Sequence, residues 1–303
     1  MSLLAVGSVA FDDLETPFGK QERVLGGSAS YFSLSASRFH PVQVVAVVGD
    51  DFGPEHYRVF DGRPIDLEGL VRKPGQSFRW KGAYGFDLNE AQTLETHLNV
   101  FAGFHPELPS AYQSSPYLFL GNIDPVLQLD VVRQMAHRPR WIALDTMNFW
   151  ILGAPDALRA VLREVDLLLV NEGEVRALSG EHNLIKAYRK IQAMGPQILV
   201  VKRGEYGAVL MTPTEVFIAP AFPLEDVFDP TGAGDTFAGG FLGYLAQVGR
   251  MDLDALKTAI LQGAVMASFT VERFGTQNLE VVTDEAIKER LKAFSAMIQV
   301  NGL

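Results

Sequence analysis

The stretch that decides the fold lies in the last third of the chain and reads DPTGAGDTFAGGF, from Asp229 to Phe241. Small residues before a helical pattern let backbone approach a ligand closely. The free amides and the positive dipole end at a helix N-terminus favour an anion. We therefore expect Gly232, Ala233 and Gly234 to form an anion hole, with Asp235 in the first helical turn beside it. A carboxylate there suits phosphoryl transfer, because it can take the proton of an attacking hydroxyl.

A simpler interpretation of these residues is a glycine turn before a helix, in which Asp235 is only a first-turn acid favoured by the helix dipole. Two other phosphate-binding patterns do not match. No GxxxxGK[ST] sequence occurs in the chain, and Phe237 occupies the position of the last glycine of a GxGxxG motif.

Outward from this stretch, short apolar runs alternate with helical patterns along the chain. The runs are continuous in apolarity, which is typical of strands buried on both faces. They are 3–7, 42–48, 117–120, 141–144, 166–170 and 198–201. The helices predicted between and after them are 28–37, 125–136, 154–163, 172–178, 183–194, 235–248, 253–269 and 283–297. This alternation predicts an α/β fold with a central, mostly parallel sheet, helices on both faces, and ligands beyond the carboxyl ends of the strands.

Two segments interrupt the alternation, about 14–25 and 71–102. Within the second, Phe78–Tyr84 and Thr93–Phe101 alternate between apolar and polar residues, which is typical of half-exposed antiparallel strands. We expect a small β-sheet lid built from these two excursions on a single domain that spans residues 1–303.

Composition excludes several classes of protein. The chain has 303 residues, of which 48 % are hydrophobic; it has 26 Lys and Arg against 36 Asp and Glu, and its formal charge is −10. Such an acidic balance argues against nucleic acid or an anionic membrane as partner. The absence of cysteine excludes disulfides and thiolate chemistry and is compatible with a cytoplasmic protein. The apolar start lacks a basic region and predicts a buried strand rather than a signal peptide, and no run is long enough to suggest a transmembrane helix.

The stretch from Asp229 to Phe237 resembles the second signature of the ribokinase (PfkB) family of sugar and nucleoside kinases, D-T-x-G-A-G-D-x-F. The resemblance implies a ribokinase-like fold with a β lid, and ATP with Mg²⁺ as cofactors. It makes Asp235 the general base and Gly232 to Gly234 the anion hole. The family's other motifs follow in the expected order over essentially the whole chain.

On the nucleotide side, Asn171 and Glu174 resemble the family's N-x-x-E motif, which implies that Glu174 organises Mg²⁺ through water. The same spacing is also a helix-capping pattern. Lys202, Gly204 and Gly207 resemble the family's [T/K]-x-G-x-x-G turn along ATP, to which Gly234 also contributes. The alternative there is a plain hairpin turn between two strands.

On the acceptor side, the resemblance assigns Asp12 to the substrate hydroxyls, with Asp13 as a close rival. Gly26 and Gly27 with Ser30 resemble the first signature, G-G-x-x-x-N, in which Tyr31 stands at the asparagine position. A lid hinge is the structural alternative for the two glycines. Asn122, at the end of a strand, is a further candidate substrate contact by position.

Two more segments resemble family elements. Residues 145–148 (DTMN) resemble a strand-end D-P-N without its proline, and 271–277 resemble a loop that flanks the adenine pocket. In many relatives that loop and the carbonyls of 229–231 hold a monovalent cation, so such an ion is a candidate cofactor here.

The expected activity is transfer of the γ-phosphate of ATP to a hydroxyl of a sugar. The alternative is a nucleoside acceptor, because the aromatic residues of the lid and Tyr31 could stack on a base; they are Phe78, Trp80, Tyr84 and Phe86. A more remote alternative is a binding protein that has lost the chemistry. The exposed lid strands favour a homodimer formed through the lid.

Overall fold

Two β-sheets form the framework of the computed structural model, which describes residues 2–89 and 91–299. Over these residues the larger sheet has nine strands in the order β13-β12-β11-β10-β9-β8-β1-β4-β5. Their bounds are β1 Leu3–Val6, β4 Val42–Val48, β5 Ile65–Arg72, β8 Tyr117–Leu120, β9 Trp141–Leu144, β10 Leu167–Asn171, β11 Ile198–Lys202, β12 Ala208–Met211 and β13 Val216–Ala219. The predicted central sheet is therefore confirmed.

The strands from β11 to β5 are all parallel, and β12 and β13 join at one edge as antiparallel strands. The first strand lies inside the sheet, where Leu3 is paired with Val42 on one side and with Tyr117 on the other. Because parallel strands share a carboxyl edge, the segments that follow β1, β8, β9, β10 and β11 meet at one side of the molecule.

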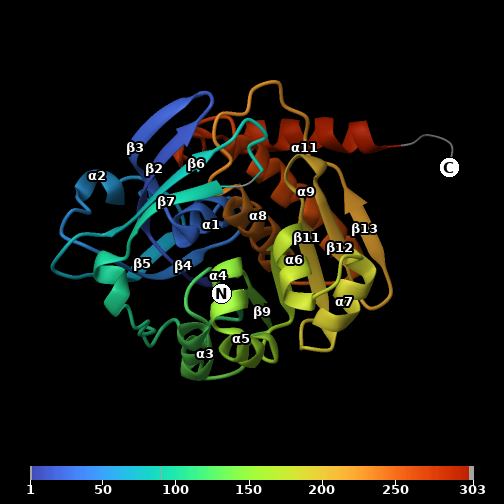
Figure 1. Cartoon of the computed structure of the whole chain (residues 1–303), viewed down its shortest axis with the longest axis horizontal. Helices are drawn as coiled ribbons and strands as arrows, with labels where there is room; N and C mark the ends of the chain where they lie inside the picture. Colours follow the sequence, from blue (N-terminus) through green and yellow to red (C-terminus); the bar gives the residue numbers. More distant parts are fainter. Residues whose placement is uncertain (1, 90, 300–303) are drawn as a thin grey trace.

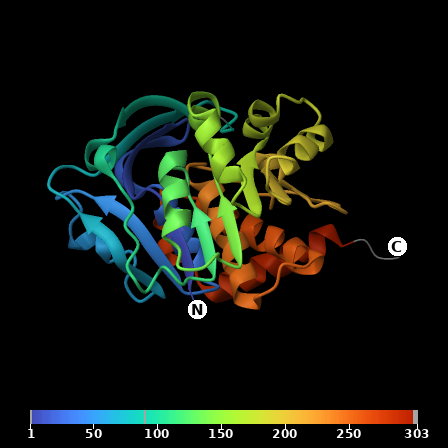
Figure 2. The same cartoon turned by 90° about the horizontal axis from the view of Figure 1, so that it is seen from below.

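Helices cover both faces of this sheet (Figure 2). One layer contains α1 (Ser28–Ala36), α8 (Ala233–Val248), α9 (Leu253–Thr270), α10 (Gln277–Val281) and α11 (Asp284–Ile298), which pack on one another. The other contains α3 (Pro125–Gln134), α4 (Asn148–Gly153), α5 (Pro155–Leu162), α6 (Glu172–Ser179) and α7 (Leu184–Gln192). A short helix, α2 (Pro54–Tyr57), follows β4.

The two helical layers explain why the strands are apolar at every position. Leu3 and Ala5 of β1 belong to the core that faces α8 and α9, whereas Leu4 and Val6 belong to the core on the opposite face. A strand covered on both faces cannot carry the polar half of an alternating pattern. The continuous apolar runs of the sequence therefore follow directly from this packing.

The second sheet is the lid, and its order is β3-β2-β6-β7 (upper left in Figure 1). Its strands are β2 (Ala10–Thr16), β3 (Gly19–Gly26), β6 (Phe78–Tyr84) and β7 (Ala91–His97). β2 pairs with β3 and β6 with β7 in antiparallel fashion, but the central β2–β6 pair is parallel. The expectation of an entirely antiparallel lid was wrong at that pair. The lid consists of two hairpins, β2–β3 and β6–β7, whose first strands lie side by side and run in the same direction.

The predicted bounds of the lid also need correction. The lid sheet begins at Ala10 rather than at about residue 14. The sequence did not indicate this start, because Phe11 is buried against Phe52 and has the apolar character of a core residue. In the second excursion, Val71 and Arg72 pair with β4 in the large sheet. The lid strand that follows begins only at Phe78.

The eight predicted helices are present, with ends that differ by a few residues. Sequence periodicity missed α2, α4 and α10, which have four to six residues each and are too short to show a repeat. Over residues 2–89 and 91–299, none of the helices combines the length and apolarity needed to cross a bilayer.

Candidate active site

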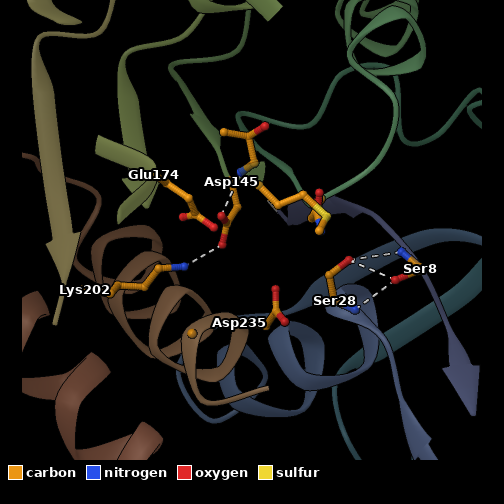
Figure 3. A pocket seen from close by; sticks show the side chains of 10 residues that line it. Ser8, Ser28, Asp145, Glu174, Lys202 and Asp235 are labelled. Atoms are coloured by element: carbon orange, nitrogen blue, oxygen red, sulfur yellow. Dashed lines mark hydrogen bonds and ion pairs between the residues drawn. The ribbon is translucent and has the colours of Figure 1, made fainter. Parts of the chain in front are cut away.

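A polar cavity of about 220 Å³ opens at the carboxyl edge of the large sheet, between the ends of β1, β8, β9, β10 and β11 and the start of α8 (Figure 3). The residues that line it are Ser8, Ser28, Asn122, Asp145, Thr146, Met147, Glu174, Lys202, Gly234 and Asp235. The sheet thus brings together residues that are more than 200 positions apart in the sequence.

The N-terminus of α8 forms one wall of the cavity. Gly232 is the N-cap and has φ of 72°, a left-handed conformation that favours glycine. The amides of Gly232, Gly234 and Asp235 have no backbone partner among the described residues, whereas the amide of Ala233 donates to the carbonyl of Pro230 at 3.2 Å. The amides free to bind an anion are therefore those on either side of Ala233.

Asp235 stands in the first turn of α8 and its side chain points into the cavity (Figure 3). Burial raises the pKa of this carboxyl, the charge of Asp145 also raises it, and Lys202 lowers it, with a net pKa of about 7. A carboxyl with a pKa near neutrality is well suited to accept a proton from an alcohol in the transition state.

Lys202, at the end of β11, forms an ion pair with Asp145 at the end of β9, with 2.7 Å between Nζ and Oδ2. Both side chains are largely buried. The ammonium also lies at the helix start, because a Cβ on Gly234 would be 3.1 Å from Nζ. Burial lowers the pKa of Lys202, but Asp145, Glu174 and Asp235 raise it above its ordinary value, so the side chain stays charged. The cavity therefore holds a fixed cation beside the free amides.

Asn171 and Glu174 form a capping box at the start of α6. The Asn171 Oδ1 accepts from the amide of Glu174 at 2.8 Å, and the amide of Asn171 donates to Glu174 Oε2 at 2.7 Å. The capping interpretation of this motif is therefore correct for Asn171, while Glu174 also lines the cavity. Burial raises the pKa of Glu174, Asp145 also raises it and Lys202 lowers it, with a net pKa of about 7.

The turn after β11 contains Gly204 and Gly207, with φ of 55° and 88°. The amide of Arg203 donates to the carbonyl of Gly207 at 2.8 Å, which closes the hairpin to β12. A Cβ on Gly207 would lie 2.1 Å from the carbonyl oxygen of Ala219, so the turn needs glycine at that position. The turn is a hairpin, as its alternative interpretation proposed, and it follows directly on Lys202.

The structure distinguishes Asp12 from Asp13, which the sequence could not. Asp13 accepts from the amide of Arg23 at 2.8 Å and pairs with Arg79 at 2.7 Å, so its charge is used within the lid. Asp12 is 4 % exposed and lies against Gly26, where a Cβ would be 1.9 Å from its Oδ2. Burial raises its pKa well above the ordinary value, and the charges of Asp229 and Asp235 raise it further.

Gly27 and Ser30 belong to the same region under the lid, at the start of α1. Gly27 is the N-cap, with φ of 91°, and a Cβ there would lie 2.5 Å from the carbonyl oxygen of Ser8. Ser30 is fully buried and its hydroxyl has no hydrogen-bond partner. Asp12, Gly26, Gly27 and Ser30 therefore share one wall beside the cavity rather than lining it.

Asn122 lines the cavity from the end of β8, as predicted from its position. Its side-chain nitrogen donates to Met147 Sδ at 3.0 Å, and its Oδ1 is buried without a partner. Sequence reasoning missed Ser8 and Ser28, and it named residues 145–148 without giving any of them a role. The one signal that could have found Ser8 and Asp145 is that each stands just past the end of a buried parallel strand.

Comparison with known proteins places this geometry in a family. The family model described as pfkB family carbohydrate kinase matches residues 6–283. The chain belongs to the PfkB family. This PfkB kinase is 28 % identical to a cytidine kinase of Thermococcus kodakarensis over 80 % of its own length and 87 % of that protein. It is 27 % identical to a nucleoside kinase of Methanothermobacter thermautotrophicus, over 94 % of each chain.

Solved structures agree with the ribokinase-like fold. An E. coli protein described as a candidate ribokinase II, whose structure contains ATP and Mg²⁺, superposes on this PfkB kinase with a TM-score of 0.79 and 19 % identity. The match covers 98 % of this chain and 99 % of the other. At this identity the likeness shows the shared fold.

Proposed function

We propose that this PfkB kinase transfers the γ-phosphate of ATP to a hydroxyl of a sugar. The observation that carries the proposal is the buried Asp235 carboxyl, at the free amides of the α8 N-terminus and beside the Lys202 ammonium. A base, an anion hole and a cation in one cavity are the groups that phosphoryl transfer requires.

The proposed step is a direct in-line displacement. Asp235 accepts the proton of the acceptor hydroxyl. The oxygen of that hydroxyl forms a bond to the γ-phosphorus, and the bond from the γ-phosphorus to the departing ADP oxygen breaks. The amides of Gly232 and Gly234 donate to the transferring phosphoryl oxygens, and Lys202 neutralises part of their charge. Ala233 shapes the loop, since its own amide is bonded to Pro230.

The side chains that line this cavity are of the kinds that would hold MgATP. Mg²⁺ keeps several waters and takes one or two carboxylates together with substrate phosphates. Glu174 and Asp145 supply two carboxylates on the wall next to Lys202, and no cluster of three or more ligating side chains exists among the described residues. We assign Glu174 to Mg²⁺ through water, and Gly204, Gly207 and Gly234 to the nucleotide. Asn171 would act mainly by holding Glu174. When bound, the metal would neutralise phosphate charge.

A nucleoside acceptor is the second candidate, and the names of the two near-full-length relatives favour it. The lid aromatics give partial support. Phe78 is already stacked on Phe101, with 5.2 Å between the ring centroids, and Phe86 is 86 % exposed. The Tyr84 hydroxyl accepts from Thr231 at 3.1 Å, so this ring lies beside the anion-hole loop. Trp80 lies in β6 with Phe78 and Tyr84, and its ring lies across Gly82.

A thermal-stability panel tests the proposal. We expect the unfolding midpoint in Mg²⁺ and a non-hydrolysable ATP analogue to rise further with at least one nucleoside or sugar, because a ligand that binds only the folded state stabilises it by mass action. If no member of a panel of nucleosides, pentoses and hexoses moves the midpoint, the proposed substrate class is wrong.

The pKa of Asp235 predicts the pH dependence of the reaction. Because the base acts only when deprotonated and its pKa is about 7, kcat/KM should fall about tenfold per pH unit on the acid side of that value. The measurement is the initial rate from pH 5 to 9 at subsaturating acceptor. A rate that stays constant down to pH 5 would show that a group of ordinary carboxylate pKa, or no base, controls the step.

Three finer expectations remain predictions. A monovalent cation near Asp229 is testable by K⁺ titration of the activity. The two carboxylate oxygens of Asp229 accept hydrogen bonds from the amides of Thr231 and Gly275, at 2.9 Å each. A homodimer through the exposed β7 edge is testable by light scattering. A cytoplasmic location is testable by fractionation. Steady ATP-dependent product formation would remove the remote alternative of a non-catalytic binding protein.

A further inference from the structure

Tyr31 carries a buried hydroxyl that the fold does not use. Its side chain is 1 % exposed, and the hydroxyl oxygen has no hydrogen-bond partner. Its ring lies flat on the anion-hole loop, because a Cβ on Gly232 would be 2.4 Å from three ring atoms. A buried donor without a partner is costly, so native proteins keep such groups mainly where a ligand or water completes them.

The surroundings of this hydroxyl are acidic. Burial raises the pKa of Tyr31 well above its ordinary value, and Asp12, Asp229, Tyr84 and Asp235 raise it further, so a negative charge is disfavoured at this hydroxyl. Contacts of Tyr31 itself place it between these groups: its amide donates to the carbonyl of Gly27 at 3.2 Å, next to Gly26, and its ring lies on Gly232, next to Thr231. Asp12 lies against Gly26 under the lid, and the Thr231 hydroxyl donates to Tyr84 Oη at 3.1 Å.

The nearby cations are engaged elsewhere. In the described part of the chain, no Lys, Arg or His forms an ion pair with Asp12, Asp229 or Asp235. Arg79 pairs with Asp13, Arg23 with Asp51, and Lys202 with Asp145 on the nucleotide side. Within residues 2–89 and 91–299, the cations near the acceptor wall are thus already paired with other carboxylates, so burying a negative group beside Asp12, Asp229 and Asp235 would be strongly unfavourable.

We propose that Tyr31 and Asp12 together select an uncharged, polyhydroxylated acceptor, to which Tyr31 donates a hydrogen bond, and that acceptors carrying a phosphate or carboxylate are rejected. The inference rests on the proposed function and narrows its substrate class. Tyr31 is a specificity-determining residue whose partner is supplied by the acceptor under the closed lid. Its ring would also transmit acceptor binding to the backbone of Gly232.

Matched pairs of acceptors test the charge rule. Cytidine is compared with cytidine 3′-monophosphate, and fructose with fructose 1-phosphate, each at saturating MgATP. In each pair whose neutral compound is a substrate, we expect kcat/KM to be at least about a hundredfold higher for the neutral compound than for its phosphorylated counterpart. Transfer to either phosphorylated compound within tenfold of its neutral counterpart overturns the proposal.

The Tyr31→Phe variant tests the hydroxyl. We expect KM for the neutral acceptor to rise about tenfold or more, with kcat within about threefold and KM for ATP unchanged. Without acceptor, the variant should unfold at the same temperature as the wild type or higher, because it loses an unpaired donor. Tyr188→Phe is the matched control: its hydroxyl donates to the carbonyl of Gln197 at 2.9 Å, so that variant should lose stability and keep both KM values.

Calorimetric binding separates this inference from the proposed function. If no compound is phosphorylated, the proposed function fails, but cytidine and fructose binding to the wild type and to Tyr31→Phe still decides the inference. Binding at least about tenfold weaker to the variant supports the role of the hydroxyl. Equal affinity for the two proteins, or no binding of either compound to the wild type, overturns it.

Discussion

Asp235→Asn is expected to lower kcat by about 10²–10⁴, because a positioned general base contributes that much and an amide cannot accept the proton. The substitution keeps the shape of the side chain and removes a buried carboxyl whose pKa burial has raised to about 7. The unfolding temperature should therefore be equal or higher, and affinity for the ATP analogue should be retained. The measurement is steady-state kcat together with titration of the nucleotide.

The control for this variant is Asp254→Asn. Asp254 is an exposed acid in the first turn of α9, as Asp235 is in the first turn of α8, so it shares any interaction with a helix dipole but faces no cavity. It should leave kcat unchanged. If Asp235→Asn keeps turnover within about tenfold of the wild type, Asp235 is only a first-turn acid and the base assignment is wrong.

Lys202→Met is expected to lower the free energy of unfolding by about 3–5 kcal/mol, because it leaves the buried Asp145 carboxylate without its partner. It should also lower kcat, since the charge next to the anion hole is lost. The acid limb of the pH profile should move to higher pH, because Lys202 holds the pKa of Asp235 down. Denaturant unfolding and the pH profile measure the two effects.

A double variant separates the ion pair from the side chains that form it. Lys202→Met with Asp145→Asn should recover part of the lost stability, because neither partner is left charged alone. Lys20→Met breaks an exposed pair with Glu15 and should cost about 0–1 kcal/mol. If Lys202→Met is as mild as Lys20→Met, the buried pair does not have the energetic role assigned to it.

The sequence was sufficient for features that depend on local patterns. The apolar runs predicted the parallel sheet, because a strand covered by helices on both faces is apolar at every position. The glycines before α8 predicted a helix start with open amides, and Asp235 entered the site with them. The amide of Ala233 was the exception, because its bond to Pro230 depends on the path of the turn.

Features that depend on sheet order could not be derived in this way. Lys202 and Asp145 meet because β9, β10 and β11 are neighbours in the sheet, although the two residues are 57 positions apart in the chain. Asp12 and Asp13 are adjacent residues of β2, and the register of β2 with β3 shifts between Asp12 and Leu14, so alternation along the strand could not assign their sides. Only the position of the lid decides which of these two side chains points toward the site.

Transfer of a labelled phosphate tests the central claim most directly. ATP labelled at its γ-phosphate is mixed with excess enzyme, Mg²⁺ and one uncharged nucleoside or sugar at a time, and the products of a single turnover are separated. We predict that the label moves from ATP to a hydroxyl of at least one acceptor and that Asp235→Asn slows this transfer by about 10²–10⁴. Label that stays on ATP, or appears only as inorganic phosphate with every acceptor, would contradict it.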